Sequence, residues 1–391
     1  MSKKVVCIVM DSVGIGALPD ADRFGDAGSD TLGHLFDAYP DLHVPNLLAL
    51  GLGHIDHVRV PRGQAQPIGC YGKAAEQFLG KDTTGGHWEI AGLVLDEPFP
   101  TFPNGFPPAL IDALTAAIGR GILGNEVASG TEIIQRLGDE HVRTGKPIVY
   151  TSADSVLQIA AHEQVIAVEE LYRICEVARK LCDGPYRVGR IIARPFVGTS
   201  ANYTRTPRRK DFSVQPPGDT MLDAICAHGL EVAAVGKIED IFAHRGITRV
   251  LHGTDNAMCI EQTLSFMQQP FSGLIFTNLV DFDMLYGHRN NAEGYARALE
   301  QFDAALPNII NALGPDDLLL ITADHGCDPT TPSTDHSREY VPILAYGKRL
   351  AKNVNLGVRK SFADLAATIC AYLGLSWPIG KSFCRELKGE K

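Results

Sequence analysis

The stretch 317–326, Asp-Leu-Leu-Leu-Ile-Thr-Ala-Asp-His-Gly, decides the expected fold. Its four consecutive apolar residues are typical of a strand that is buried on both faces, as in a parallel sheet. The run stops at Asp324 and His325, and Gly326 gives the backbone the freedom to turn. In open α/β sheets, ligands bind beyond the carboxyl ends of the strands. An aspartate and a histidine placed there offer an oxygen and a nitrogen to one divalent metal, although ordinary polar capping of a strand end explains such a pair equally well.

Two further stretches repeat this pattern of a buried strand followed by candidate metal ligands. Residues 5–10 are apolar and end at Asp11, and residues 273–280 are followed by Asp283 and His288. Each of these side chains, taken alone, also fits a structural role such as forming a turn. Neighbouring parallel strands end at the same edge of a sheet, so we expect a single cluster there. Its members are Asp11, Asp283, His288, Asp324, His325 and His336.

Six ligands of this kind suit a pair of divalent ions. Mixed oxygen and nitrogen ligation is compatible with Mn²⁺, Zn²⁺ or Mg²⁺. Two metals roughly 4 Å apart can clamp the attacking and leaving oxygens of an in-line phosphoryl displacement. The cluster therefore predicts phosphoryl-group chemistry.

The stretch 80–89, Gly-Lys-Asp-Thr-Thr-Gly-Gly-His-Trp-Glu, predicts a polar loop leading into a helix that begins near His87. A hydroxyl at the start of a helix is either a capping group or a nucleophile, held where backbone N–H groups favour a phosphate. Spacing alone favours the capping role for Thr83 and leaves the nucleophile open.

Two proline-rich stretches, 98–108 and 207–217, divide the chain. The length of 391 residues also exceeds what one ordinary core supports. We therefore predict a core domain, 1–97 and 216–391, that carries an inserted smaller domain, 98–215. The patterns predict helices at 108–118, 168–181, 292–306 (ending or kinking near Pro307) and 362–373, and strands at 147–150, 232–235 and 341–346.

The predicted insertion contains candidate substrate-binding residues. Asp154 lies in a polar turn after a strand, and Arg190 and Arg194 lie on a β-like run. Two guanidinium groups suit bidentate contact with a sugar phosphate, while an ion pair within the domain is an equally good explanation. The basic run 205–210 fits either a solvated linker or contact with a small anion, since six residues are too few for a duplex footprint.

Charge and composition restrict the class of protein. A formal net charge of -10 argues against a general nucleic-acid-binding role. The nine cysteines include no Cys-x-x-Cys pair, so we do not expect a disulfide framework. We expect instead a cytoplasmic chain with reduced cysteines. The apolar run at 5–10 is too short for a secretion signal, and no stretch has the length needed to span a bilayer.

Taken together, the motifs resemble the alkaline phosphatase superfamily and, almost end to end, its phosphopentomutase family. The metal motifs are residues 281–288 and 322–326, followed by 335–336. The supporting stretches are 11–16, 80–89, 150–158, 192–196 and 335–339. The resemblance implies an alkaline-phosphatase-like α/β core, with a central, mostly parallel sheet flanked by helices, and makes the insertion a smaller α/β cap domain.

The resemblance also assigns roles within the site. One Mn²⁺ would be held by Asp11, Asp324 and His325, and a second by Asp283, His288 and His336. Thr83 would carry the phosphoryl group, which reverses the capping interpretation; the adjacent Thr84 is the alternative hydroxyl. Asp154, Arg190, Arg194 and Lys237 would lie near the sugar phosphate.

The implied reaction interconverts α-D-ribose 1-phosphate, or its 2-deoxy analogue, with the 5-phosphate. Phosphorylated Thr83 would donate its phosphoryl group to form a sugar 1,5-bisphosphate intermediate, which would also act as activator. We expect a small-molecule pentose phosphate as the partner, no nucleic acid or membrane, and a monomer or weak homo-oligomer.

Three other functions compete with this one. A phosphatase or sulfatase of the same superfamily would transfer the group to water, and the six ligands do not separate it from a mutase. A cofactor-independent phosphoglycerate mutase is expected to use a serine nucleophile where this loop offers Thr83. A metal-binding module without catalysis would lack the candidate nucleophile.

Overall fold

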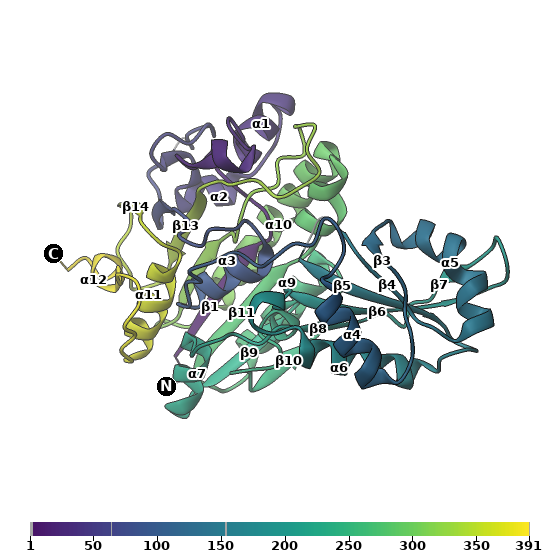
Figure 1. The fold of residues 1–391 in the computed structure, drawn as a ribbon. Coiled ribbons are helices and arrows are strands. Elements are labelled where there is room, and N and C mark those ends of the chain that lie inside the picture. The colour runs from purple at the N-terminus through teal and green to yellow at the C-terminus, as the bar shows by residue number, and fades with distance from the viewer. Residues whose placement is uncertain (1–2, 64, 153–154, 391) are drawn as a thin grey trace. The chain divides into compact units, whose positions relative to one another are not determined.

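The computed structural model describes residues 3–63, 65–152 and 155–390. The chain divides into two compact units (Figure 1). Unit 1 comprises residues 1–98 and 216–391, and unit 2 comprises residues 99–215. Asp154, one of the predicted substrate-binding residues, lies outside the described residues.

The sheet of unit 1 has eight strands among the described residues. Their order is β10 (Arg249–Leu251), β9 (Glu231–Val235), β11 (Gly273–Leu279), β1 (Lys4–Met10), β12 (Leu318–Thr322), β13 (Val341–Tyr346), β2 (Cys70–Ala74) and β14 (Val354–Arg359). Strand β13 runs antiparallel to both of its neighbours, and the other neighbouring strands pair in parallel. The predicted mostly parallel central sheet is confirmed.

The three strands that were predicted as buried form the middle of this sheet. Every residue of β1, β11 and β12 is buried, as expected for strands covered on both faces. In the register of the sheet, Met10 pairs with Leu279 and Val9 pairs with Thr322. The three strands therefore end at one edge, and the residues that follow them emerge there together.

Helices flank the sheet of unit 1 (Figure 1). They are α1 (Thr31–Ala38), α2 (Pro45–Leu50), α3 (Thr83–Ile90), α7 (Met221–Ala227), α8 (Ile238–Ile241), α9 (Asn256–Gln268), α10 (Ala292–Ala312), α11 (Ala363–Leu373) and α12 (Cys384–Leu387). Helix α9 packs on β9, β11 and α10, whereas α11 packs on β1, α3 and α7. This arrangement confirms the predicted α/β class.

The prediction allowed helix α10 to end or to kink near Pro307, and the first alternative is wrong because the helix continues to Ala312. Proline lacks an N–H group, which leaves the carbonyl four residues earlier without its helical donor. That carbonyl, Asp303 O, instead accepts a hydrogen bond of 3.0 Å from the side-chain amide of Asn46 on α2. The buried face of the helix, which includes Leu306 and Ile309, continues past the proline and holds the last turns in place.

Unit 2 is built on its own mixed sheet. The strands run in the order β3 (Leu123–Val127), β4 (Ile148–Thr151), β5 (Val156–His162), β6 (Arg190–Val197) and β7 (Thr204–Arg205), and β8 (Lys210–Ser213) also pairs with β6. Helices α4 (Pro108–Ile118) and α6 (Val168–Leu181) have the predicted bounds and share one apolar cluster. Helix α5 (Gly130–Thr144) packs on β3, β4 and β5.

Within the part of the chain that the structure describes, no helix combines the length and the apolar composition that crossing a membrane requires.

Candidate metal centre and nucleophile

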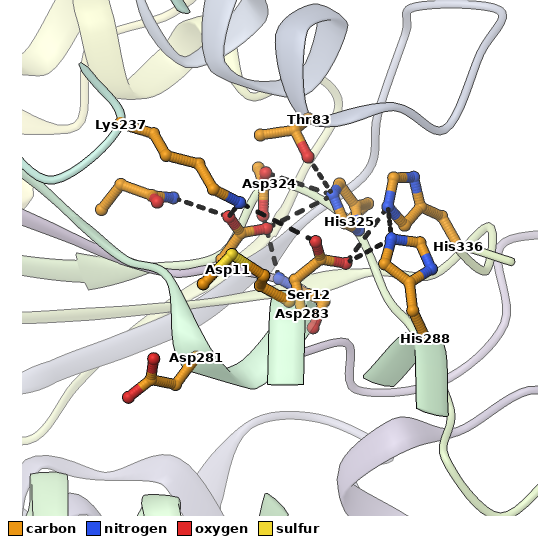
Figure 2. Close-up of polar contacts among 12 residues, drawn as sticks. Asp11, Ser12, Thr83, Lys237, Asp281, Asp283, His288, Asp324, His325 and His336 are labelled. Atoms are coloured by element: carbon orange, nitrogen blue, oxygen red, sulfur yellow. Dashed lines mark hydrogen bonds and ion pairs between the residues drawn. The ribbon is translucent and has the colours of Figure 1, made fainter. Parts of the chain in front are cut away.

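The six predicted ligands lie together beyond the carboxyl ends of β1, β11 and β12 (Figure 2). Asp11 follows β1, and Asp324 and His325 follow β12. The segment after β11 forms a π-helical turn, η4 (Phe282–Tyr286), and a 3-10 turn, η5 (Gly287–Arg289), and the connection from β12 to β13 supplies the last ligand. These three segments contribute Asp283, His288 and His336.

Asp11, Asp324 and His325 form the first donor group. All three side chains are fully buried, and each offers a ligand atom within 4.8 Å of the other two. The Nε2 atom of His325 lies 3.2 Å from Asp324 Oδ2 and 3.5 Å from Asp11 Oδ1. This is the grouping that the resemblance assigns to one ion.

The second donor group surrounds Asp283. Its Oδ1 atom lies 3.2 Å from Nε2 of both His288 and His336, and these two nitrogens are 3.1 Å apart. The neighbouring Asp281 instead accepts a hydrogen bond from the backbone N–H of Asn256, and it points away from the centre (Figure 2). Asp283 is therefore the carboxylate of this motif that faces the ligands.

The sequence did not single out Cys327, whose thiol approaches Asp283 and His288 closely enough to be a ligand. Burial raises the pKa of Cys327 above its ordinary value, which opposes formation of the thiolate that binds metals. No spacing motif marks this cysteine. Its proximity arises from the turn that follows β12.

Hydrogen bonding shows that the donor set fits cations. The Nδ1 atom of His288 lies 2.7 Å from Thr334 O, and that of His325 lies 3.0 Å from Gly326 O. Because a carbonyl only accepts, each Nδ1 carries a proton, so a ring that binds a metal would do so through the Nε2 lone pair, which faces the centre. Three buried carboxylate oxygens that also face the centre accept no hydrogen bond: Asp11 Oδ1, Asp283 Oδ1 and Asp324 Oδ2.

Lone pairs and carboxylates repel one another unless positive charge lies between them. In a chain without bound metal, burial and the charge of Asp324 raise the pKa of Asp11 to about 6. Contact with the carboxylate of Asp283 raises the pKa of His288 to about 9, so a proton takes the place of a metal there. Lys237 adds a positive charge, since its Nζ atom lies 3.5 Å from Asp11 Oδ2 and 3.9 Å from Asp283 Oδ2.

Thr83 lies beside the first donor group. Its Oγ1 atom is 3.1 Å from His325 Nε2, and it is the first residue of α3 (Figure 2). The N-cap position belongs to Asp82, whose Oδ1 accepts a hydrogen bond of 2.9 Å from Gly85 N. The capping role once favoured for Thr83 is thus filled by its neighbour.

The prediction that this helix begins near His87 was wrong, because α3 already begins at Thr83. Gly85 and Gly86 suggested a loop, but both lie inside the helix. A Cβ atom on Gly86 would lie 2.3 Å from Asp324 O, so the absence of a side chain lets α3 approach the end of β12. The glycines serve close packing of the nucleophile helix against the metal ligands.

The remaining predicted residues belong to different units. Lys237 lies beside the metal centre of unit 1. Arg190 and Arg194 lie in unit 2 on the same face of β6; Arg190 is 3.5 Å from Asp211, and Arg194 donates a 3.0 Å hydrogen bond to Gln158.

Arg205 on β7 was not selected from the sequence. Its Nε atom is buried and has no hydrogen-bond partner. Arg194 and Arg205 share one electrostatic environment in which burial, followed by the charge of Arg209, lowers the pKa of Arg194. The sequence feature that could have identified Arg205 is the basic run 205–210. Its interpretation as a contact for a small anion fits this concentration of positive charge.

Comparison with known proteins places this site in a family. A model described as the metalloenzyme superfamily matches residues 3–377. A phosphopentomutase of Acetivibrio thermocellus is 59% identical over 97% of this chain and 98% of its own length, and one of Desulfitobacterium hafniense is 58% identical over 98% and 100%. Among solved structures, the PH0037 protein from Pyrococcus horikoshii covers 97% of this chain and 99% of its own at 14% identity and a TM-score of 0.48, a likeness too distant to inform the site.

The full-length relatives share one name, and they span both the metal centre and unit 2. The chain therefore belongs to the phosphopentomutase family of the metalloenzyme superfamily, and it is an enzyme of the isomerase class.

Proposed function

We propose that this enzyme interconverts α-D-ribose 1-phosphate, and its 2-deoxy analogue, with the corresponding 5-phosphate. The observation that carries the proposal is the position of Thr83, whose hydroxyl lies 3.1 Å from His325 at the edge of a donor set suited to two metals. Relatives named phosphopentomutase, at 54–59% identity over nearly the full chain, support a pentose phosphate as the substrate.

The residues present fit two divalent ions. Asp11, Asp324 and His325 would hold one, and Asp283, His288 and His336 the other. Mn²⁺ suits this mixed set of oxygen and nitrogen ligands. When bound, the ions supply positive charge to the transferring phosphoryl group.

The chain positions the phosphoryl group through the start of α3. Thr83 is the first residue of that helix, where backbone N–H groups and the helix dipole favour an anion. In the proposed cycle, the bond from phosphorus to Thr83 Oγ1 breaks as a bond forms to the free hydroxyl of the sugar phosphate. The resulting 1,5-bisphosphate reorients and returns its other phosphoryl group to Thr83, so the number of phosphoryl groups is conserved.

Unit 2 is proposed as the cap domain that recognises the substrate. Arg190 and Arg194 would bind its distal phosphate, and the buried, unpartnered Nε of Arg205 supports adding this residue to them. Asp154 would accept hydrogen bonds from the sugar hydroxyls. A cap that excludes water favours transfer to a sugar over hydrolysis, the outcome that would define a phosphatase.

The phosphorylated residue can be identified directly. Enzyme incubated with Mn²⁺ and a pentose 1,5-bisphosphate should acquire one phosphate on the peptide that contains Thr83, detected by mass spectrometry. Thr83→Ala should abolish both this phosphate and mutase turnover while Mn²⁺ binding persists. Thr84→Ala is the matched control and should keep both. Phosphate or full turnover in Thr83→Ala would remove Thr83 from the mechanism.

A further inference from the structure

We propose that His87 and Asn278 are positioning residues, which link the backbone of Thr83 to the carboxylates of Asp11 and Asp324 through uncharged hydrogen-bonding groups. The inference rests on the proposed function, since it concerns the same nucleophile and the same metal pocket. Neither residue was selected from the sequence as part of the site.

The two side chains lie between the nucleophile helix and the metal ligands. His87 is fully buried on α3, one turn after Thr83, and its Nδ1 atom is 2.9 Å from Thr83 O and 3.1 Å from Asp324 Oδ2. Its Nε2 atom is 3.2 Å from Nδ2 of Asn278, a fully buried residue of β11. The same Asn278 Nδ2 lies 3.0 Å from Asp11 Oδ2.

The two ends of this chain fix the direction of every hydrogen bond in it. The carboxylate of Asp11 and the carbonyl of Thr83 only accept, so Asn278 turns its amide nitrogen toward Asp11. The second amide N–H then donates to His87 Nε2, which places the imidazole proton on Nδ1. From there His87 donates to Thr83 O and presents the same polarised N–H to Asp324 Oδ2.

This arrangement orients two metal-ligating carboxylates. Asn278 engages Oδ2 of Asp11 and leaves Oδ1 directed toward His325. Oδ1 of Asp324 accepts a 3.0 Å hydrogen bond from Ser12 N, and its Oδ2, which accepts no hydrogen bond, lies 3.1 Å from His87 Nδ1. Ser12 adopts a φ of 75°, which for a residue other than glycine is strained and marks this turn as tightly constrained.

The chain of hydrogen bonds through His87 and Asn278, called the relay below, also fixes the nucleophile relative to the metal pocket. Because His87 holds the carbonyl of Thr83, movement of the first turn of α3 would break the contact with Asp324 or with Asn278. The linking groups are uncharged, so they add no charge to a centre that already contains three carboxylates. Groups behind metal ligands commonly alter metal affinity roughly 10- to 100-fold when they are replaced.

A pair of substitutions separates this role from simple filling of the core. The amide nitrogen of His87→Asn lies near the position of Nδ1 and can still donate to Thr83 O. The amide of His87→Gln lies near the position of Nε2 and loses that donor, although glutamine is closer to histidine in size. Core filling alone therefore favours the glutamine variant, and the relay favours the asparagine variant.

The experiment uses the full chain and measures Mn²⁺ affinity by equilibrium dialysis, together with kcat and KM for ribose 5-phosphate. We expect His87→Gln to weaken Mn²⁺ binding and lower kcat, each roughly 10- to 100-fold, with KM little changed. His87→Asn should recover most of both losses. His228→Gln is the matched control, because His228 makes the same contact with the carbonyl four residues earlier but lies exposed directly after α7.

Asn278→Leu keeps the test decisive if His87→Gln fails to fold, since leucine retains the volume but not the hydrogen bonds. It should weaken Mn²⁺ binding as His87→Gln does. Wild-type Mn²⁺ affinity and kcat in His87→Gln or in Asn278→Leu would overturn the proposal. If wild-type enzyme binds Mn²⁺ but shows no mutase turnover, the proposed function fails, while the effect of these variants on Mn²⁺ affinity still decides the relay.

Discussion

Asp11, Asp283 and Asp324 are buried within one centre, where their charges oppose folding unless cations neutralise them. The rise in the pKa of Asp11 to about 6, caused by burial and by the charge of Asp324, is one sign of this conflict. Lys237 and the histidines lie close enough to these carboxylates to offset charge when no metal is bound. Stability and metal binding are therefore coupled in this chain.

Relative to the wild type, Asp11→Asn should stabilise the protein when no metal is bound and should destabilise it when Mn²⁺ is bound. With a chelator, the variant should unfold at a higher temperature than the wild type, because one buried charge is removed. With Mn²⁺ at a hundred times its Kd, the wild type should gain about 2.7 kcal/mol, and the variant should lose most of that gain.

Thermal unfolding with chelator and with Mn²⁺ measures both effects. Asp22→Asn, at an exposed position of unit 1, removes the same charge and should change neither result. An Mn²⁺-induced stabilisation of Asp11→Asn equal to that of the wild type would contradict the assignment of Asp11 as a ligand.

Single residues differ in how far the sequence could predict them. The six ligands lie in the segments that follow three buried strands, so a local pattern located them at the sheet edge, and their binding of metal stays a prediction. His87, Asn278 and Arg205 carry no such pattern. Asn278, for example, lies inside β11, and the sequence alone predicts only a buried strand residue there. Its contact with Asp11 on the neighbouring strand segment becomes known only from the structure.

At the scale of single elements, tertiary contacts decided the boundaries that sequence patterns misplaced. Glycines inside α3 resemble a loop locally, but the approach of Gly86 to Asp324 O gives them a packing role. Proline inside α10 resembles a helix end, but Asn46 supplies the missing donor to Asp303 O. Helices α4 and α6 were predicted with their observed bounds, because their amphipathic pattern coincides with their packing in unit 2.

The contact between α5 and β5 should make unit 2 sensitive to acid. The buried His141 donates from Nδ1 to Lys146 O, and its Nε2 accepts a hydrogen bond of 2.8 Å from His162 N. Burial lowers the pKa of His141 below its ordinary value of 6.5. As the pH falls through 6.5, the unfolded chain takes up the proton first, so stability that is present at higher pH is lost below it.

Hydrogen exchange of α5 peptides at pH 7.5 and pH 5.5 measures this effect. Protection should fall at the lower pH in the wild type and should change less in His141→Gln, whose side-chain oxygen accepts without titrating. Equal losses of protection in the two proteins would show that His141 is not the responsible group.

At the scale of the whole molecule, the chain leaves and re-enters unit 1 at neighbouring points. Met221 N, just after unit 2, donates a 2.8 Å hydrogen bond to Ala91 O, just before it. The two proline-rich stretches lie at these junctions. The order of the strands in unit 1 could not be predicted from the sequence, because it depends on pairings between distant segments. Strand β14 has a bulge and exposed residues, so it lacks a clear alternating pattern.

If unit 2 recognises substrate while unit 1 holds the metals, the two functions should separate genetically. Arg194→Ala should lower kcat/KM for ribose 5-phosphate roughly 10- to 100-fold, since a charge-assisted hydrogen bond contributes about 1.5–3 kcal/mol. Stabilisation by Mn²⁺ should stay unchanged. Arg143→Ala, which removes an exposed arginine from α5 of the same unit, should leave both quantities at wild-type values. Loss of the Mn²⁺ response in Arg194→Ala would argue against this division.

The most direct test of the central claim is a turnover assay on ribose 5-phosphate with Mn²⁺ and a trace of sugar bisphosphate, which follows ribose 1-phosphate and free phosphate together. The account predicts ribose 1-phosphate without stoichiometric release of phosphate. Release of phosphate without ribose 1-phosphate would contradict the mutase mechanism and would make the enzyme a hydrolase.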